Sequence, residues 1–180
     1  MRVENLASNT GELRDVVLPH LLGQVFHVTT GTGLHGIQRS GAIVPNSDGR
    51  FPWSTTQSPS SYGRSIAGVC LVDLRTATRE VIDDALDRYY FLDPFTATRV
   101  NAFILLGAPA LNALVPNHVG RGNFERLVVV PNVEVWYPGR LSLRLIDRVI
   151  RVKLKRPGKW DHMNLAVLEE IFAQRKAREK

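Results

Sequence analysis

Residues 24–41 read QVFHVTTGTGLHGIQRSG, and they predict a strand that runs directly into a helix. The strand covers the apolar run through Val28, and Thr29 or Thr30 is the kind of residue that caps a helix N-terminus. Gly41 is a typical residue to end that helix, because glycine adopts the left-handed backbone conformation at low cost. The helix carries two apolar side chains one turn apart, Leu34 and Ile37.

His27 lies within this apolar strand, close to the point where the helix begins. Amide groups at a helix N-terminus favour phosphate, and a neutral imidazole nearby can hydrogen-bond a ribose hydroxyl. The run Gly31-Thr32-Gly33 lies there too, but it lacks the lysine and the flanking residues of a phosphate-binding loop. A core histidine that is bonded to a backbone carbonyl is the alternative interpretation of His27.

The other apolar patterns predict strands and helices in irregular order. Strands are expected at 42–45, 68–74, 101–106, 124–130, 133–137 and 149–155, and helices at 10–22, 78–89, near 111, at 142–147 and from 161 to about 178. The first helix is expected to be interrupted near Pro19. Such mixing favours an α+β fold over a doubly wound parallel sheet. At 180 residues, with 44% hydrophobic and 22% charged residues, the chain suits a single domain, 1–180.

Positive charge is concentrated late in the sequence. Residues 1–138 hold 11 Lys and Arg against 12 Asp and Glu, whereas residues 139–180 hold 12 against 5. In the strand expected at 149–155, apolar residues alternate with three cations, Arg151, Lys153 and Lys155. This distribution suits contact with nucleic acid, and a solvated face that aids solubility is an equal alternative.

Several other kinds of site and segment are not indicated. The five histidines have no metal-ligand spacing, and neither a P-loop nor a nucleophile-elbow motif is present. Cys70, the single cysteine, excludes an internal disulfide framework and is expected to be a buried core thiol. Because the sequence has no membrane-length apolar run and no signal-peptide pattern, we expect no membrane partner and a cytoplasmic location.

Three segments resemble ADP-ribosyltransferases, and in particular the DarT-type DNA ADP-ribosyltransferase toxins. The first is Phe26-His27-Val28-Thr29 with the helix and glycine turn that follow it. In that family the corresponding histidine binds the adenosine ribose of NAD, which implies NAD contacts for His27, for Thr29 and for the nearby backbone at Gly33. The resemblance also implies the family fold, a split mixed and antiparallel sheet with short flanking helices.

The second segment, residues 58–64, reads SPSSYGR and precedes an expected strand. The resemblance implies that Tyr62 stacks on nicotinamide and that Arg64 neutralises the diphosphate as part of the catalytic site. Trp53 and Arg50, in the long loop before this segment, are rivals for these two roles. A tyrosine that simply packs at a turn is the alternative for Tyr62.

The third segment, residues 132–146, reads NVEVWYPGRLSLRLI and resembles the stretch around the catalytic glutamate of the family. Glu134 is the implied catalytic acid, and Glu125, one expected strand earlier, is the alternative. Asn132 stands where many relatives carry Gln or Glu two residues before the acid. Because that position often helps to select the acceptor, the modified residue is left open.

The resemblance implies an NAD-dependent transferase of the glycosyltransferase class that moves ADP-ribose to a macromolecule without a metal ion. DNA or another nucleic acid is the first choice of acceptor, and protein is the second. A toxin or defence effector is implied, while an antitoxin or immunity partner and the oligomeric state are left open. Two alternatives are a non-enzymatic nucleic-acid-binding module on the same fold and an RNA 2′-phosphotransferase-like enzyme, whose set of Arg and His motifs is not found.

Overall fold

The computed structural model describes residues 1–9, 12–51, 63, 66–88, 100–116 and 133–155. Within those residues, a seven-stranded sheet has the strand order β1-β9-β5-β2-β4-β7-β6. Its strands are β1 (Arg2–Ser8), β2 (Val25–Thr30), β4 (Gly68–Asp73), β5 (Val100–Leu106), β6 (Val115–Pro116), β7 (Glu134–Pro138) and β9 (Ile146–Leu154). β1 and β9 pair in parallel, and the other ladders of this sheet are antiparallel.

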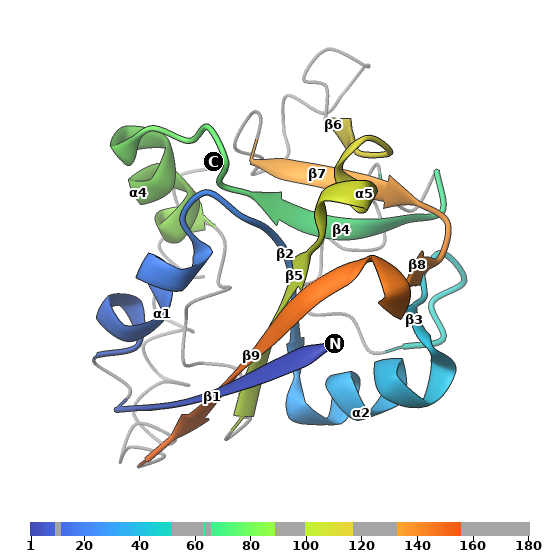
Figure 1. Ribbon diagram of the computed structural model, residues 1–180. Helices are drawn as coiled ribbons and strands as arrows, with labels where there is room; N and C mark the ends of the chain where they lie inside the picture. Colours follow the sequence, from blue (N-terminus) through green and yellow to red (C-terminus); the bar gives the residue numbers. More distant parts are fainter. Residues whose placement is uncertain (10–11, 52–62, 64–65, 89–99, 117–132, 156–180) are drawn as a thin grey trace, which may run out of the picture.

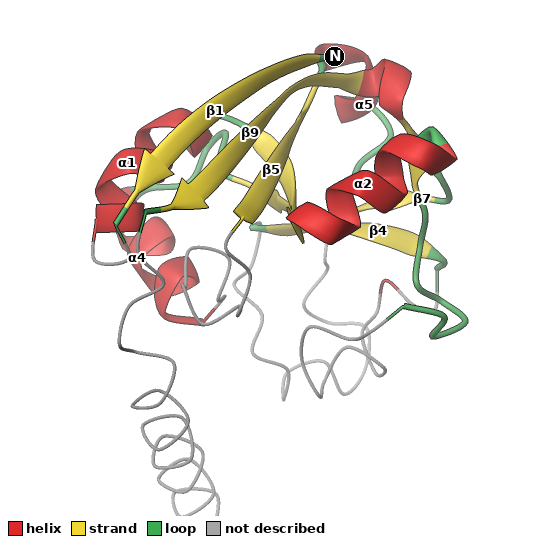
Figure 2. Ribbon diagram, turned by 90° about the horizontal axis from the view of Figure 1, so that it is seen from below, coloured by secondary structure: helices red, strands yellow, loops and turns green. Residues whose placement is uncertain are grey.

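Short helices and a small second sheet pack on the two faces of this sheet (Figure 1 and Figure 2). The helices are α1 (Leu13–Leu21), α2 (Gly31–Ser40), α4 (Arg79–Arg88) and α5 (Ala108–Leu111). The second sheet pairs β3 (Ala42–Ile43) with β8 (Leu141–Ser142), and the 3₁₀ turn Leu143–Leu145 follows it. Helices α1 and α4 lie side by side, away from α2 and α5 (Figure 2).

The sheet has a hydrophobic core on each face, and the alternation of side chains along β5 distinguishes them. Phe103 and Leu105 belong to the core beneath α1 and α4, whereas Ile104 and Leu106 belong to the core beneath α2 and α5. Phe26 contacts Phe103 edge to face, with 6.1 Å between ring centroids. Because both faces of β5 are covered, its sequence is a continuous apolar run rather than an alternating one.

Strand β2 runs directly into helix α2, as the sequence predicts. The Thr30 hydroxyl accepts a hydrogen bond from the Gly33 N–H at 3.0 Å, so Thr30 rather than Thr29 is the cap. The helix ends at Gly41, whose φ of 70° is left-handed. Leu34 is buried against the sheet and anchors α2 to it.

The predicted α+β class, with a mixed and mostly antiparallel sheet, is confirmed. Strand β1 is not predicted from the sequence, because it is an edge strand whose residues are mostly exposed. The expected interruption near Pro19 is wrong, since α1 continues to Leu21. Pro19 lies in the last turn, where its missing N–H removes only a hydrogen bond to the exposed Asp15. The strand expected at 124–130 and the helix expected from 161 lie outside the described residues.

Candidate functional site

The seven-stranded sheet divides between its central strand, β2, and the neighbouring strand β4. Their ladder consists of two register pairs, Val25 with Asp73 and Phe26 with Val72. Beyond Phe26, β2 pairs only with β5 and β4 pairs only with β7. The two halves of the sheet therefore separate there, and Figure 1 shows β4 and β7 running across the direction of β5 and β9.

His27 is the first residue beyond the last β2–β4 pair, and its side chain bridges the two strands. Its Nδ1 lies 2.9 Å from the carbonyl oxygen of Cys70 on β4. Since a carbonyl oxygen can only accept, Nδ1 carries the proton. Burial lowers the pKa of His27 below its ordinary value of 6.5, and the hydrogen bond to Cys70 opposes this shift only in part. The ring is therefore neutral at pH 7, and Nε2 is a hydrogen-bond acceptor.

The hydrogen bond to the Cys70 carbonyl agrees with the alternative interpretation, in which His27 is a core histidine bonded to a backbone carbonyl. That bond uses one ring nitrogen, however, and the residue is half-buried rather than enclosed in either core. His27 can therefore hold its structural bond and bind a ligand hydroxyl through Nε2 at the same time.

Glu134 begins β7 and lies across β4 from β2. It pairs in register with Val72, which in turn pairs with Phe26, the neighbour of His27. The protein packed around the Cys70 thiol, and secondly the negative charge of Glu134, raises the pKa of the thiol well above its ordinary 9.0, although the residue as a whole is exposed. The half-buried Glu134 carboxylate therefore acts on the same residue whose carbonyl binds His27. Three adjacent strands thus contribute His27, Cys70 and Glu134 to this part of the sheet, where the register puts the side chains of Cys70 and Glu134 on the face of Phe26 and that of His27 on the other face.

Cys70 is exposed, so the expectation of a buried core thiol is wrong. Val69 and Leu71 on either side are 3% and 1% exposed, and strand alternation turns Cys70 to the opposite face of β4. Its raised pKa keeps the thiol protonated at neutral pH, which argues against a nucleophilic role.

Thr29 and Gly33 lie together where β2 meets α2. A Cβ atom on residue 33 would be 2.1 Å from Thr29 Oγ1, so the close approach of helix and strand requires glycine there. Thr29 follows His27 by two residues on one strand, and the two side chains therefore face the same side of the sheet. The Gly33 N–H is already bound by Thr30, which leaves fewer helix amides for a phosphate.

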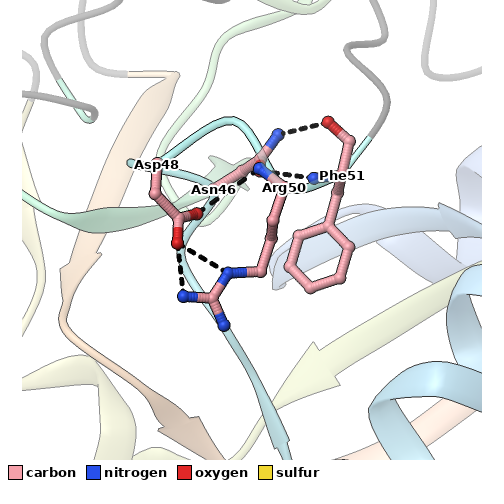
Figure 3. Close-up of polar contacts among 4 residues, drawn as sticks. All are labelled: Asn46, Asp48, Arg50 and Phe51. Atoms are coloured by element: carbon pink, nitrogen blue, oxygen red, sulfur yellow. Dashed lines mark hydrogen bonds and ion pairs between the residues drawn. The ribbon is translucent and has the colours of Figure 1, made fainter.

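Arg50 lies in the exposed turn of residues 46–51 (Figure 3). Its Nε donates to Asp48 Oδ2 at 2.7 Å, and a second guanidinium nitrogen donates to the same oxygen. Asn46 closes the turn through two 2.9 Å hydrogen bonds to the backbone of Phe51. Asp48 therefore offsets the positive charge that a diphosphate-binding role requires of Arg50.

The structure does not place four of the predicted site residues, because they lie outside the described ranges. These are Tyr62, Arg64, Trp53 and the alternative acid Glu125.

Arg151 and Lys153 lie on an open part of the sheet face, and Lys155 follows them at the end of β9. Strand pairing places Asn5 beside Arg151 and Ala7 beside Lys153. A hollow of about 260 Å³ is lined by Asn5, Leu6, Ala7, Val100, Arg151 and Lys153. All three cations are exposed, and none of them pairs with an acidic side chain in the described part of the chain.

This cationic face adjoins the split. Thr29 pairs with Ala102 on β5, and Ala102 pairs with Arg151 on β9, so the three side chains share one face. Two strand spacings separate Thr29 from Arg151, a distance of about 10 Å. The contribution of β1 to this face is missed by the sequence analysis, since its signal is only a weak alternation in residues 2–8.

Metal and membrane features are absent from the residues that the structure describes. They contain no group of three or more His, Cys, Asp or Glu side chains that could hold a metal ion. They also contain no helix long and apolar enough to cross a membrane. No protein-family model, curated protein or solved structure matches the chain.

Proposed function

We propose that the chain is an NAD-consuming ADP-ribosyltransferase, with Glu134 and His27 as its principal site residues. One observation carries the proposal: the sheet splits between β2 and β4, and His27 bridges the split to Cys70, two residues before Val72, the register partner of Glu134. The motif resemblance implies a split sheet, a ribose-binding histidine and a catalytic glutamate. The described geometry is compatible with both roles.

His27 binds the adenosine ribose in this proposal. Its Nδ1 proton is committed to Cys70, and the neutral ring therefore offers Nε2 to a ribose hydroxyl as an acceptor. A protonated imidazole could not accept that bond. The lowered pKa is thus the property that the role requires.

Glu134 stabilises the reacting ribose. When the bond between nicotinamide and ribose breaks, its electron pair leaves with nicotinamide and positive charge develops on the ribose ring, as in glycoside hydrolysis. A carboxylate held beside the ring stabilises that charge. The acceptor then forms a bond to the same ribose carbon and loses its proton, which Glu134 or solvent accepts.

Nucleic acid is the acceptor class that the charge distribution favours. Arg151 and Lys153 face the same side of the sheet as Thr29, without a described acidic partner. Cations in such a position attract a phosphate backbone. A protein acceptor is the second choice, and the transfer experiment below distinguishes the two.

The test is incubation of the full chain with NAD labelled on its adenylate, together with single-stranded DNA, duplex DNA, RNA or cell lysate. We expect label on nucleic acid, and a loss of about 10²–10³-fold in transfer rate for Glu134→Gln, because one charge-stabilising group is removed. Glu12→Gln, at the exposed start of α1, is the matched control and should retain activity.

Each other outcome changes a defined part of the proposal. Activity that survives Glu134→Gln and disappears in Glu125→Gln would assign the catalytic role to Glu125. Label on protein would change the acceptor class. Absence of both NAD binding and transfer, with salt-dependent nucleic-acid binding, would replace the enzyme with a non-enzymatic binding module.

A further inference from the structure

The indole nitrogen of Trp136 is an unpartnered donor inside the protein. Trp136 is 4% exposed, and its Nε1 is buried without a hydrogen-bond partner. It is the sole buried side-chain nitrogen or oxygen in the described ranges with this property. Folded proteins pair nearly all such groups, and the exceptions concentrate where an ion, a water or a functional ligand supplies the missing partner.

Trp136 lies within the candidate site. It follows Glu134 by two residues on β7, so strand alternation puts both side chains on one face. It also pairs in register with Cys70, whose carbonyl oxygen binds His27. The unpartnered donor therefore belongs to the same part of the sheet as the proposed catalytic acid.

Two glycines lie close to Trp136. A Cβ atom on residue 63 would lie 1.7 Å from Cζ3 of the ring, so the Gly63 backbone rests directly against the indole. A Cβ atom on Gly68 would lie 3.3 Å from the Trp136 Cβ. The Gly63 backbone therefore restricts the movement of the ring.

We propose that Trp136 is a ligand-binding residue that donates its Nε1–H to an oxygen on the nicotinamide half of NAD. The inference rests on the proposed function, and the position beside Glu134 selects that half of the dinucleotide. The acceptor is either an oxygen of the nicotinamide ribose or the carboxamide oxygen, because each accepts a hydrogen bond from a neutral donor.

The first measurement follows the indole N–H signals of the ¹⁵N-labelled full chain by NMR. The three tryptophans give three such signals, and Trp136→Phe identifies one of them by its loss. If that variant does not fold, Trp53→Phe and Trp160→Phe identify it by elimination. We expect saturating NAD to shift the Trp136 signal, and AMP, which lacks the nicotinamide half, to leave it unmoved.

ADP-ribose distinguishes the two acceptor oxygens. A shift that persists with ADP-ribose assigns the bond to the ribose, and a shift seen only with NAD assigns it to the carboxamide. An unmoved signal with bound NAD, or an equal shift with AMP, would overturn the inference.

The second measurement is NAD affinity by calorimetry. Trp136→Phe keeps an aromatic ring and removes the donor, so we expect NAD to bind about three- to tenfold more weakly. Tyr137→Phe is the matched control, because its ring packs in the core on the opposite face, and its affinity should equal that of the unaltered chain. Equal affinity in Trp136→Phe would overturn this inference alone, whereas no NAD binding by the unaltered chain would overturn the proposed function as well.

Discussion

Cys70 connects the two proposed site residues in the free protein. Its carbonyl oxygen binds His27, and its thiol is affected by the charge of Glu134. It is also exposed and is the single cysteine of the chain, so the rate at which a thiol reagent modifies the protein measures the reactivity of Cys70 alone.

The reactivity of Cys70 should therefore respond to the charge of residue 134. Glu134→Gln removes the negative charge that contributes to the raised thiol pKa. The pKa then falls, the thiolate fraction at mildly alkaline pH increases, and alkylation becomes faster. The measurement is the rate of reaction with iodoacetamide across neutral to alkaline pH. Glu12→Gln should leave the rate unchanged. Equal rates in both variants would show that the charge of Glu134 does not act on the Cys70 thiol.

Single residues are predictable from this sequence where a motif surrounds them. His27 and Glu134 can be selected because each stands within a strand pattern that resembles a known site. The exposure of Cys70 cannot be predicted in the same way. Its apolar neighbours indicate burial, whereas the face that it occupies depends on where β2 and β4 stop pairing.

The start of helix α2 is the element that sets the position of Thr29 beside the split. Its stability depends on the Thr30 hydroxyl, which accepts from the Gly33 N–H at 3.0 Å. Thr30→Ala leaves that amide without its cap, and we expect the free energy of unfolding to fall by about 0.5–2 kcal/mol. Urea denaturation measures the change. Thr32→Ala, in the same turn but exposed and without a cap bond, should have little effect, and an equal loss in both variants would contradict the capping role.

Elements with strong internal patterns are predictable, and elements that depend on distant partners are not. The continuous apolar run of β5 and the alternation of β9 both predict strands correctly. A strand buried on two faces has a continuous apolar sequence, and a strand buried on one face has an alternating one, so the local residues indicate each strand. Strand β1 differs, since its ladder to β9 consists of backbone hydrogen bonds that its own side chains do not indicate.

At the scale of the whole molecule, the cationic face of β9 should dominate the salt dependence of nucleic-acid binding. The double variant Arg151→Gln/Lys153→Gln removes two cations, which reduces the slope of log affinity against log salt by about 1.4 for a single strand. Fluorescence anisotropy with labelled single-stranded DNA over a range of salt concentrations measures the slope. Arg79→Gln is the control, because that side chain is 92% exposed on α4. An unchanged slope in the double variant would remove this face from the acceptor site.

The parallel ladder between β1 and β9 also determines when the sheet can be completed during synthesis. Strand β9 lies between β1 and β5 and supplies Ile150 and Val152 to the core beneath α1 and α4. A nascent chain therefore leaves one edge of β5 unpaired until residues 146–154 have left the ribosome. Sheets built on such long-range pairing fold slowly and late. Residues 146–154 therefore complete the edge of β5 last, after the strands that form the split, β2, β4 and β7, have already been synthesised.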